Sequence, residues 1–292
     1  MTMARAHSPA GAQTPAGGPA PMRDGAADDG AARNAPVVVL TYGNAGGRRL
    51  QMLLESQPEL TCTTSTGVLA ACEQAAAAWR QIEGRPAKVL SPLAVKSVRA
   101  MATQMIMAVT VRSGRPRWCE LAAADPSAAE AFLEVFPGTR FVCLHRACPD
   151  LMSNVLLASP WGLAGAGFAP YVTAYPGSTV AALTAWWAGH AGPVLDFERA
   201  HPGSCMRLHY TNVTEDPDTA LNSVRAFLRL GGPDILPSAP GDAPARDAAA
   251  GLANGDDVPD LPLDQIPPPL LAQVNQLHAE LGYPQVAASG TR

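Results

Sequence analysis

The sequence lacks several features that would point to particular classes of protein. Its six cysteines include no Cys-x-x-Cys pair, which disfavours a disulfide framework and favours reduced, mostly buried thiols. No run of about 18 apolar residues is present, so we expect no membrane span. The formal net charge of -4 disfavours a general nucleic-acid-binding protein, which normally carries a basic excess. Because the start of the chain has no apolar export segment, we expect a cytoplasmic protein.

Two segments are poor in the residues that build a core. Residues 1–35 are dominated by Ala, Gly and Pro and contain no aromatic residue, so burial cannot offset their ordering entropy and we predict a disordered tail. Residues from about 237 to 264 are similarly rich in Pro, Ala, Gly and Asp and predict a flexible loop. Only one helix, at about 267–281, follows this loop, and we expect it to dock on the core. Residues 36–292 are therefore predicted to form a single domain.

The segment between the tail and the loop alternates short apolar runs with helical patterns. We expect strands at 37–40, 117–121, 140–145 and 205–210, and helices at 68–82, 92–111, from Pro149, at 180–191 and at 221–230. A further helix is capped by Asp125 and ends near Val135. This alternation predicts a three-layer α/β fold with a central, mainly parallel sheet. Ligands of such folds bind at the carboxyl ends of the strands.

A glycine-rich turn joins the first expected strand to a helix. The apolar run 37–40 leads into residues 41–49, Thr-Tyr-Gly-Asn-Ala-Gly-Gly-Arg-Arg, and the helical pattern 50–54 follows directly. Loop amides and a helix N-terminus both favour a bound anion, and Arg48 and Arg49 add positive charge. The turn lacks the Gly-Lys-Ser/Thr of a Walker A sequence. It therefore predicts a phosphate cradle of another kind, and a purely structural turn is the alternative.

A second candidate element follows the strand at 140–145. Arg146 leaves the end of this strand, and a guanidinium fixed there can hold a phosphate through two hydrogen bonds. Pro149 and Asp150 then open a helix, a role that can be purely structural. Ser153 and Asn154 lie about two turns along the same helix and could reach the same ligand.

Together the two elements resemble the sulfotransferase family that uses 3′-phosphoadenosine-5′-phosphosulfate (PAPS). That family shows a Pro-Arg-Ser-Gly-Thr-Thr-like loop, then Leu-Leu and an "hPEl" segment, matched here by residues 43–48, 53–54 and 57–60. Its second site follows an "FP.arfv.l.R…D" pattern, matched by residues 136–146 and Asp150. Tyr210, Pro217 and residues 227–230 match the family's later "Y…P…FL.l" segment, and Leu-Gly-Tyr at 281–283 is also typical. The resemblance covers most of residues 36–232 and the final helix, and implies a P-loop NTPase-like sulfotransferase architecture.

The chain departs from the family pattern at five positions. The loop's usual Arg or Lys is Asn44, and the usual Thr-Thr pair is Gly47-Arg48. A Lys often found after the family's "rW.." segment, here Arg117-Trp118, is Leu121. The serine expected eight residues beyond Arg146 is Asn154, with Ser153 one residue early. Arg48 could supply the charge that Asn44 lacks. The pattern resembles a divergent bacterial branch, and a non-catalytic copy of the fold remains an alternative.

The resemblance implies where the PAPS phosphates bind. The loop and the second site supply the implied cofactor residues: Gly43, Asn44, Ala45, Gly46, Gly47, Arg48, Arg49, Arg146, Ser153 and Asn154. The catalytic candidates are Arg48, which would neutralise developing charge, and the carboxylates Glu120 and Glu73 as possible general bases. For both acids a structural role is the alternative. We expect His145 and His209 to be structural, and His190 or His201 could act only if their segment folds over the site. No metal site is predicted, because no His/Cys/Asp cluster has ligand-like spacing.

The acceptor is indicated only by the segment 160–171, which is aromatic and rich in glycine. Trp161, Phe168, Tyr171 and Tyr175 could line an apolar pocket for a small, natural-product-like hydroxyl or phenol, as in secondary metabolism. A surface loop is the alternative for this segment. Two other functions stay open: a nucleotide-dependent phosphotransferase, and a binding module on a degenerate sulfotransferase fold. The sequence does not indicate an oligomeric state.

Overall fold

The protein is described by a computed structural model that covers residues 35–84, 89–159, 162–163, 167–231 and 261–287. The tail predicted for residues 1–35 lies almost wholly outside this range, as does most of the loop predicted at 237–264. The final residues of that loop form a short 3-10 helix, η2 (Leu263–Gln265). None of the helices within these ranges is long and apolar enough to cross a membrane.

The centre of the fold is a five-stranded sheet in which every pair of neighbours is parallel. Its order is β2-β3-β1-β4-β5, so β1 lies between strands that come later in the chain. The strands are β1 (Val37–Thr41), β2 (Leu60–Thr64), β3 (Arg117–Ala123), β4 (Arg140–His145) and β5 (Cys205–His209). The parallel sheet confirms the predicted α/β class.

Helices connect the strands. They are α2 (Gly47–Glu55), α3 (Val68–Glu83), α4 (Pro92–Thr110), α5 (Pro126–Val135), α6 (Cys148–Ala158), α7 (Ala169–Ala174), α8 (Thr179–Ala200), α9 (Tyr210–Glu215), α10 (Pro217–Leu228) and α11 (Pro268–Leu281). Two of their ends are formed by the residues that the sequence predicts. Asp125 caps α5 by accepting hydrogen bonds from the amides of Ser127 and Ala128. Gly282, with a φ of 79°, ends α11.

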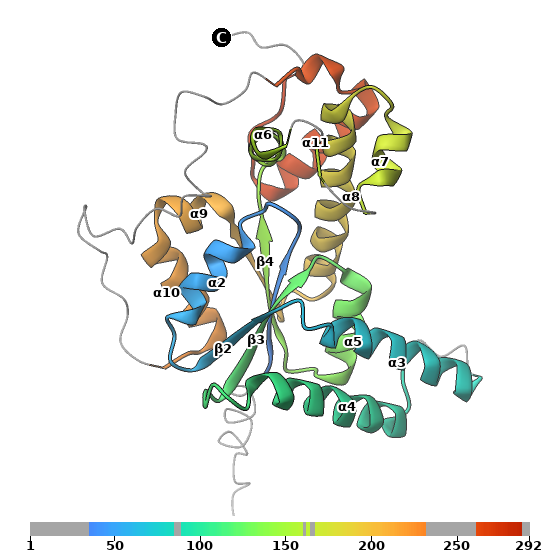
Figure 1. The fold of residues 1–292 in the computed structure, drawn as a ribbon, viewed down its shortest axis with the longest axis vertical. Coiled ribbons are helices and arrows are strands. Elements are labelled where there is room, and N and C mark those ends of the chain that lie inside the picture. Colours follow the sequence, from blue (N-terminus) through green and yellow to red (C-terminus); the bar gives the residue numbers. More distant parts are fainter. Residues whose placement is uncertain (1–34, 85–88, 160–161, 164–166, 232–260, 288–292) are drawn as a thin grey trace, which may run out of the picture.

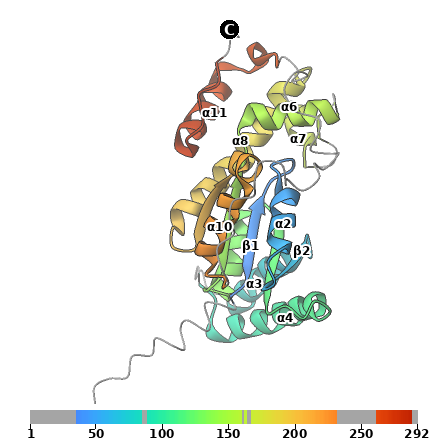
Figure 2. The same cartoon turned by 90° about the vertical axis from the view of Figure 1, so that its left-hand side faces the viewer.

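The helices form two layers on the sheet and a cap at one edge. Helices α2, α9 and α10 pack on one face, while α3, α4, α5 and the end of α8 share a core with the other (Figure 1). Helices α6, α7, α11 and the first half of α8 gather beyond the carboxyl ends of the strands (Figure 2). The strand β1 runs toward this cap (Figure 2), and β4 lies parallel to it. Any ligand at the strand ends therefore lies between the sheet and the helical cap.

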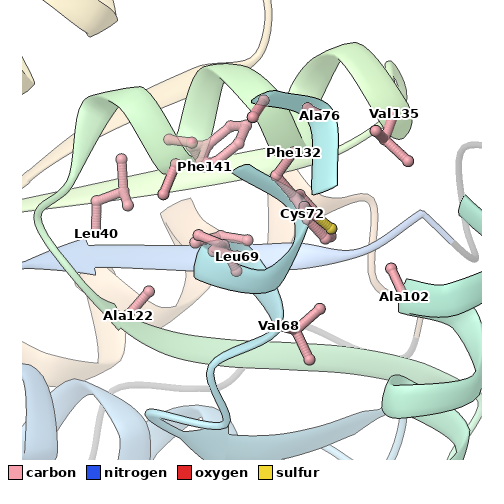
Figure 3. Packing of buried hydrophobic residues seen from close by; sticks show 14 of the residues in the cluster. Leu40, Val68, Leu69, Cys72, Ala76, Ala102, Ala122, Phe132, Val135 and Phe141 are labelled. Atoms are coloured by element: carbon pink, nitrogen blue, oxygen red, sulfur yellow. The ribbon is translucent and has the colours of Figure 1, made fainter. Parts of the chain in front are cut away.

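The core beneath α3 and α5 is built from side chains of alternate strand positions. Leu40 of β1 and Phe141 of β4 meet Leu69 and Cys72 of α3 and Phe132 of α5 (Figure 3). All of these side chains are buried. This packing fixes the positions of β1 and β4, the two strands from which the candidate site emerges.

Several element predictions were wrong in extent, and one strand was missed. The strand expected at 205–210 stops at His209, and Tyr210 opens α9. The helix expected at 180–191 continues through Pro193 to Ala200, because Val194 and Phe197 are buried against the sheet. The strand β2 was not predicted, since its five residues include three threonines and it pairs only with β3 at the edge of the sheet.

The core beneath α5 yields a test of the fold. Phe132 is 0% exposed and packs against Trp118 and Phe136, so Phe132→Ala should lower the free energy of unfolding by about 3–5 kcal/mol. Urea denaturation followed by circular dichroism would measure this change. Ile82→Ala is the matched control, because Ile82 is 73% exposed and its removal should stay within about 0.5 kcal/mol. Equal effects of the two substitutions would contradict the packing described here.

Candidate functional site

The glycine-rich turn forms a tight connection between β1 and α2. Asn44 and Gly46 both adopt positive φ angles, 62° and 95°, and Gly46 caps the helix by accepting hydrogen bonds from the amides of Arg49 and Leu50. Within the described residues, the amides of Gly46, Gly47 and Arg48 donate no hydrogen bond. Free amides at the start of a nine-residue helix form an environment that favours an anion.

Two of the loop glycines are required by their neighbours. A Cβ on Gly47 would lie 2.8 Å from Thr41 Cγ2 and 2.9 Å from Leu121 Cδ1. A Cβ on Gly46 would collide with the ring of Tyr210. The loop backbone therefore lies directly against β3 on one side and against the start of α9 on the other.

Arg146 connects the end of β4 to this loop. Its Nη1 donates a hydrogen bond of 2.9 Å to the Asn44 carbonyl, and its guanidinium carbon lies 4.2 Å from the centre of the Tyr210 ring. Its Nε is buried and has no hydrogen-bond partner in the described part of the chain. Burial lowers the pKa of Arg146 from its usual value, but an arginine of this kind remains charged at neutral pH. The Arg146 side chain thus connects the residues that follow β4 to the glycine-rich turn that follows β1.

The other predicted cofactor residues differ in their surroundings. Arg48 is exposed, and no hydrogen bond of its side chain is found among the described residues. Arg49 is turned toward α9, where its Nε donates to the Val213 carbonyl over 3.3 Å. On α6, Ser153 is buried and Asn154 half-buried. Arg48 is therefore the loop arginine that stays free to meet a ligand.

The two carboxylates predicted as general bases have other partners. Glu120 is 1% exposed and accepts hydrogen bonds from Thr63, from the Thr66 amide (2.6 Å) and from the Thr66 hydroxyl (2.9 Å). It thereby ties β3 to the turn that follows β2. Glu73 accepts a hydrogen bond from Ser127 at the start of α5. No contact found among the described residues joins either acid to the loop or to Arg146, and their catalytic roles stay predictions.

Three of the histidines discussed above have defined polar partners. His145 is fully buried, and its Nε2 lies 2.6 Å from Glu198 Oε1. Burial by itself raises the pKa of Glu198, but the contacts with His145 and Arg207 outweigh it and hold this pKa below its usual value. His190 and His201 contact the Trp186 carbonyl and Glu130, each at 2.7 Å. These contacts fit the structural role predicted for His145.

Three aromatic side chains near Arg146 were not predicted as part of the site. Tyr210 lies between Arg146 and Gly46, while Tyr42 and Trp187 bind the main chain of Arg146. Tyr210 was recognised only as a position of the family pattern. Nothing in the sequence indicated the other two contacts, because they join segments 41 and 104 residues apart.

A separate cavity of about 690 Å³ opens beside the ends of β4 and β5. Its polar and charged lining includes Asp150, Thr211, Glu215, His209, His278 and Tyr283. None of the predicted cofactor residues lines it. Of the predicted acceptor residues, Phe168 is buried, Tyr171 and Tyr175 are half-buried, and Trp161 lies outside the described residues. Across the described ranges, no group of three His, Cys, Asp or Glu side chains is placed to hold a metal ion.

The fold is a parallel α/β sheet in which a glycine-rich turn with free amides lies beside Arg146 at the carboxyl ends of the strands. The chain belongs to the sulfotransferase family, whose profile matches residues 36–234. No match was found among curated proteins.

Solved structures show the same fold at low sequence identity. The sulfotransferase domain from the curacin biosynthetic pathway is 13% identical, with a TM-score of 0.53 over 87% of this chain and 99% of that one. A sulfotransferase from Alicyclobacillus acidocaldarius is also 13% identical, with a TM-score of 0.51 over 86% of this chain and 97% of that one.

The contact between Gly46 and Tyr210 can be tested by substitution. Gly46→Ala would place a methyl group at positive φ and against the Tyr210 ring, so we expect it to destabilise the protein by about 2–4 kcal/mol. Gly67→Ala is the matched control: Gly67 caps α3 with a φ of 79° and has open space around it. It should cost only about 1 kcal/mol, for the backbone alone. Urea unfolding measures both destabilisations. Adding Tyr210→Ala to Gly46→Ala should remove most of the extra cost that Gly46→Ala has over Gly67→Ala. Equal costs at the two glycines would show that Tyr210 does not confine the loop.

Proposed function

We propose that this protein transfers a sulfuryl group from PAPS to a hydroxyl or phenol of a small acceptor. The observation that carries the proposal is the meeting of free loop amides with Arg146, whose buried Nε has no partner within the described residues. The loop amides and Arg146 can each bind an anion, and both lie at one edge of the sheet. A donor with phosphates at both its 5′ and 3′ positions requires two such groups. Family membership supports the reaction type.

The residues present fit such a donor. The amides of Gly46, Gly47 and Arg48, with the exposed Arg48 side chain, would hold the 5′-phosphosulfate. Arg146, with Ser153 or Asn154, would hold the 3′-phosphate. PAPS itself supplies the activated sulfuryl group. The protein's contribution is then to orient donor and acceptor and to neutralise charge on the leaving phosphate through Arg48 and the helix N-terminus.

A small, natural-product-like acceptor in the cytoplasm is the substrate class we propose. One structure of the same fold is a domain of the curacin biosynthetic pathway, and aromatic side chains of the helical cap, Phe168, Tyr171 and Tyr175, belong to the apolar cluster beside the loop. Apolar and aromatic walls suit an acceptor with little charge. Glu120 and Glu73 remain candidates for the general base, although both already hold hydrogen-bond partners.

Two other functions make different predictions. A nucleotide-dependent phosphotransferase would bind ATP with Mg²⁺, but the loop lacks the Lys-Ser/Thr pair that this chemistry uses. A degenerate binding module, suggested by Asn44 and Leu121, would bind neither nucleotide.

Calorimetric titration with the product nucleotide, 3′-phosphoadenosine 5′-phosphate (PAP), tests the proposal. We expect micromolar PAP binding and no heat with ATP and Mg²⁺. Arg146→Ala should weaken PAP binding by about 1–3 kcal/mol, the value of a lost charge-assisted contact. Arg112→Ala is the control, because Arg112 is exposed beyond the end of α4, and it should leave the affinity unchanged.

Each other outcome has a distinct meaning. Tight ATP binding would favour the phosphotransferase, and silence with both nucleotides would favour the degenerate module. PAP binding that is unchanged in Arg146→Ala would remove Arg146 from the site while leaving the donor in place.

A further inference from the structure

The main chain of Arg146 is held on both sides by aromatic side chains. The Arg146 amide donates to the Tyr42 hydroxyl over 3.2 Å, and that hydroxyl lies 3.3 Å from the Arg146 carbonyl, to which it donates. The indole Nε1 of Trp187 donates to the same carbonyl over 2.9 Å. The amide and the carbonyl of Arg146 are thus bound by side chains from the residue that follows β1 and from α8.

These contacts are shielded from water. Tyr42 is 3% exposed and Trp187 0% exposed, so water does not compete for the hydrogen bonds. Burial raises the pKa of Tyr42 well above its usual value, which keeps its hydroxyl protonated and able to donate. Tyr42 and Trp187 also belong to the same apolar cluster, which includes residues of α6, α8 and α11.

We propose that Tyr42 and Trp187 are positioning residues that fix the main chain of Arg146 so that its guanidinium meets a 3′-phosphate. This inference depends on the proposed function. Among the described residues the Arg146 side chain donates one hydrogen bond, to the Asn44 carbonyl of the loop, and its guanidinium lies over the ring of Tyr210 in α9. Its direction is therefore set by how its main chain leaves β4. A rotation there would carry the guanidinium away from the loop.

The proposal predicts a loss that depends on the 3′-phosphate. Tyr42→Phe removes two hydrogen bonds and Trp187→Phe one, while both keep an aromatic ring. Each should weaken PAP roughly tenfold, the effect of a buried hydrogen bond. Binding of AMP, which lacks the 3′-phosphate, should change less than about twofold. A purely structural role would instead weaken both nucleotides together.

The experiment compares PAP and AMP titrations of the full chain, with AMP measured by competition where it binds weakly. Trp118→Phe is the matched control, since it also removes a buried indole donor, but one that binds Thr63 Oγ1 at 2.7 Å on the β2–β3 side of the sheet. Its ratio of PAP to AMP affinity should equal that of the wild type. Urea unfolding confirms that each variant is folded, and Tyr42→Phe serves alone if Trp187→Phe does not fold.

The outcomes separate this inference from the proposed function. Wild-type protein that binds no PAP would overturn both. Wild-type protein that binds PAP, with Tyr42→Phe unchanged or equally weakened for PAP and AMP, would overturn only the positioning role. A selective loss of PAP affinity in Tyr42→Phe but not in Trp118→Phe would support it.

Discussion

The parallel pairing of β1 with β4 is the constraint on which the site depends. The register sets Val37 opposite Arg140 and Leu40 opposite Cys143, so both strands end at the same edge and at nearly the same height. The turn after β1 and the residue after β4 must then meet, and the hydrogen bond from Arg146 to Asn44 shows that they do. Packing on both faces of these strands keeps them in that register.

Much of this arrangement could be predicted from the sequence, and the limits have physical reasons. The runs that became β1, β3 and β4 are mostly buried, whereas β2 is rich in threonine and lies at the edge. The loop glycines and Arg146 could be identified because each is marked by its own residue type and by its immediate neighbours in the sequence. Tyr42, Trp187 and Tyr210 could not be assigned, because their partners lie far along the chain and depend on tertiary packing.

The departures from the family pattern fit one another sterically. Leu121 Cδ1 lies 2.9 Å from where a Cβ on Gly47 would be, so this leucine and a larger residue at position 47 exclude each other. Asn44 takes a φ of 62°, a conformation that asparagine tolerates better than most residues. Gly47 and Leu121, which look like independent losses in the sequence, therefore form one packed contact between the loop and β3.

The charge of Arg146 explains why this arrangement favours an anion. Within the described residues its guanidinium forms no salt bridge; its neighbours are a carbonyl and an aromatic face, and its Nε is unsatisfied. A largely buried cation without a paired anion lowers the stability of the folded protein. Hydrogen bonds from Tyr42 and Trp187 to the main chain of Arg146 hold it in this position. A phosphate would supply the missing charge and the missing acceptor together. Under the proposed function, the same burial that makes an unpaired Arg146 costly in the free protein would strengthen its contact with the donor.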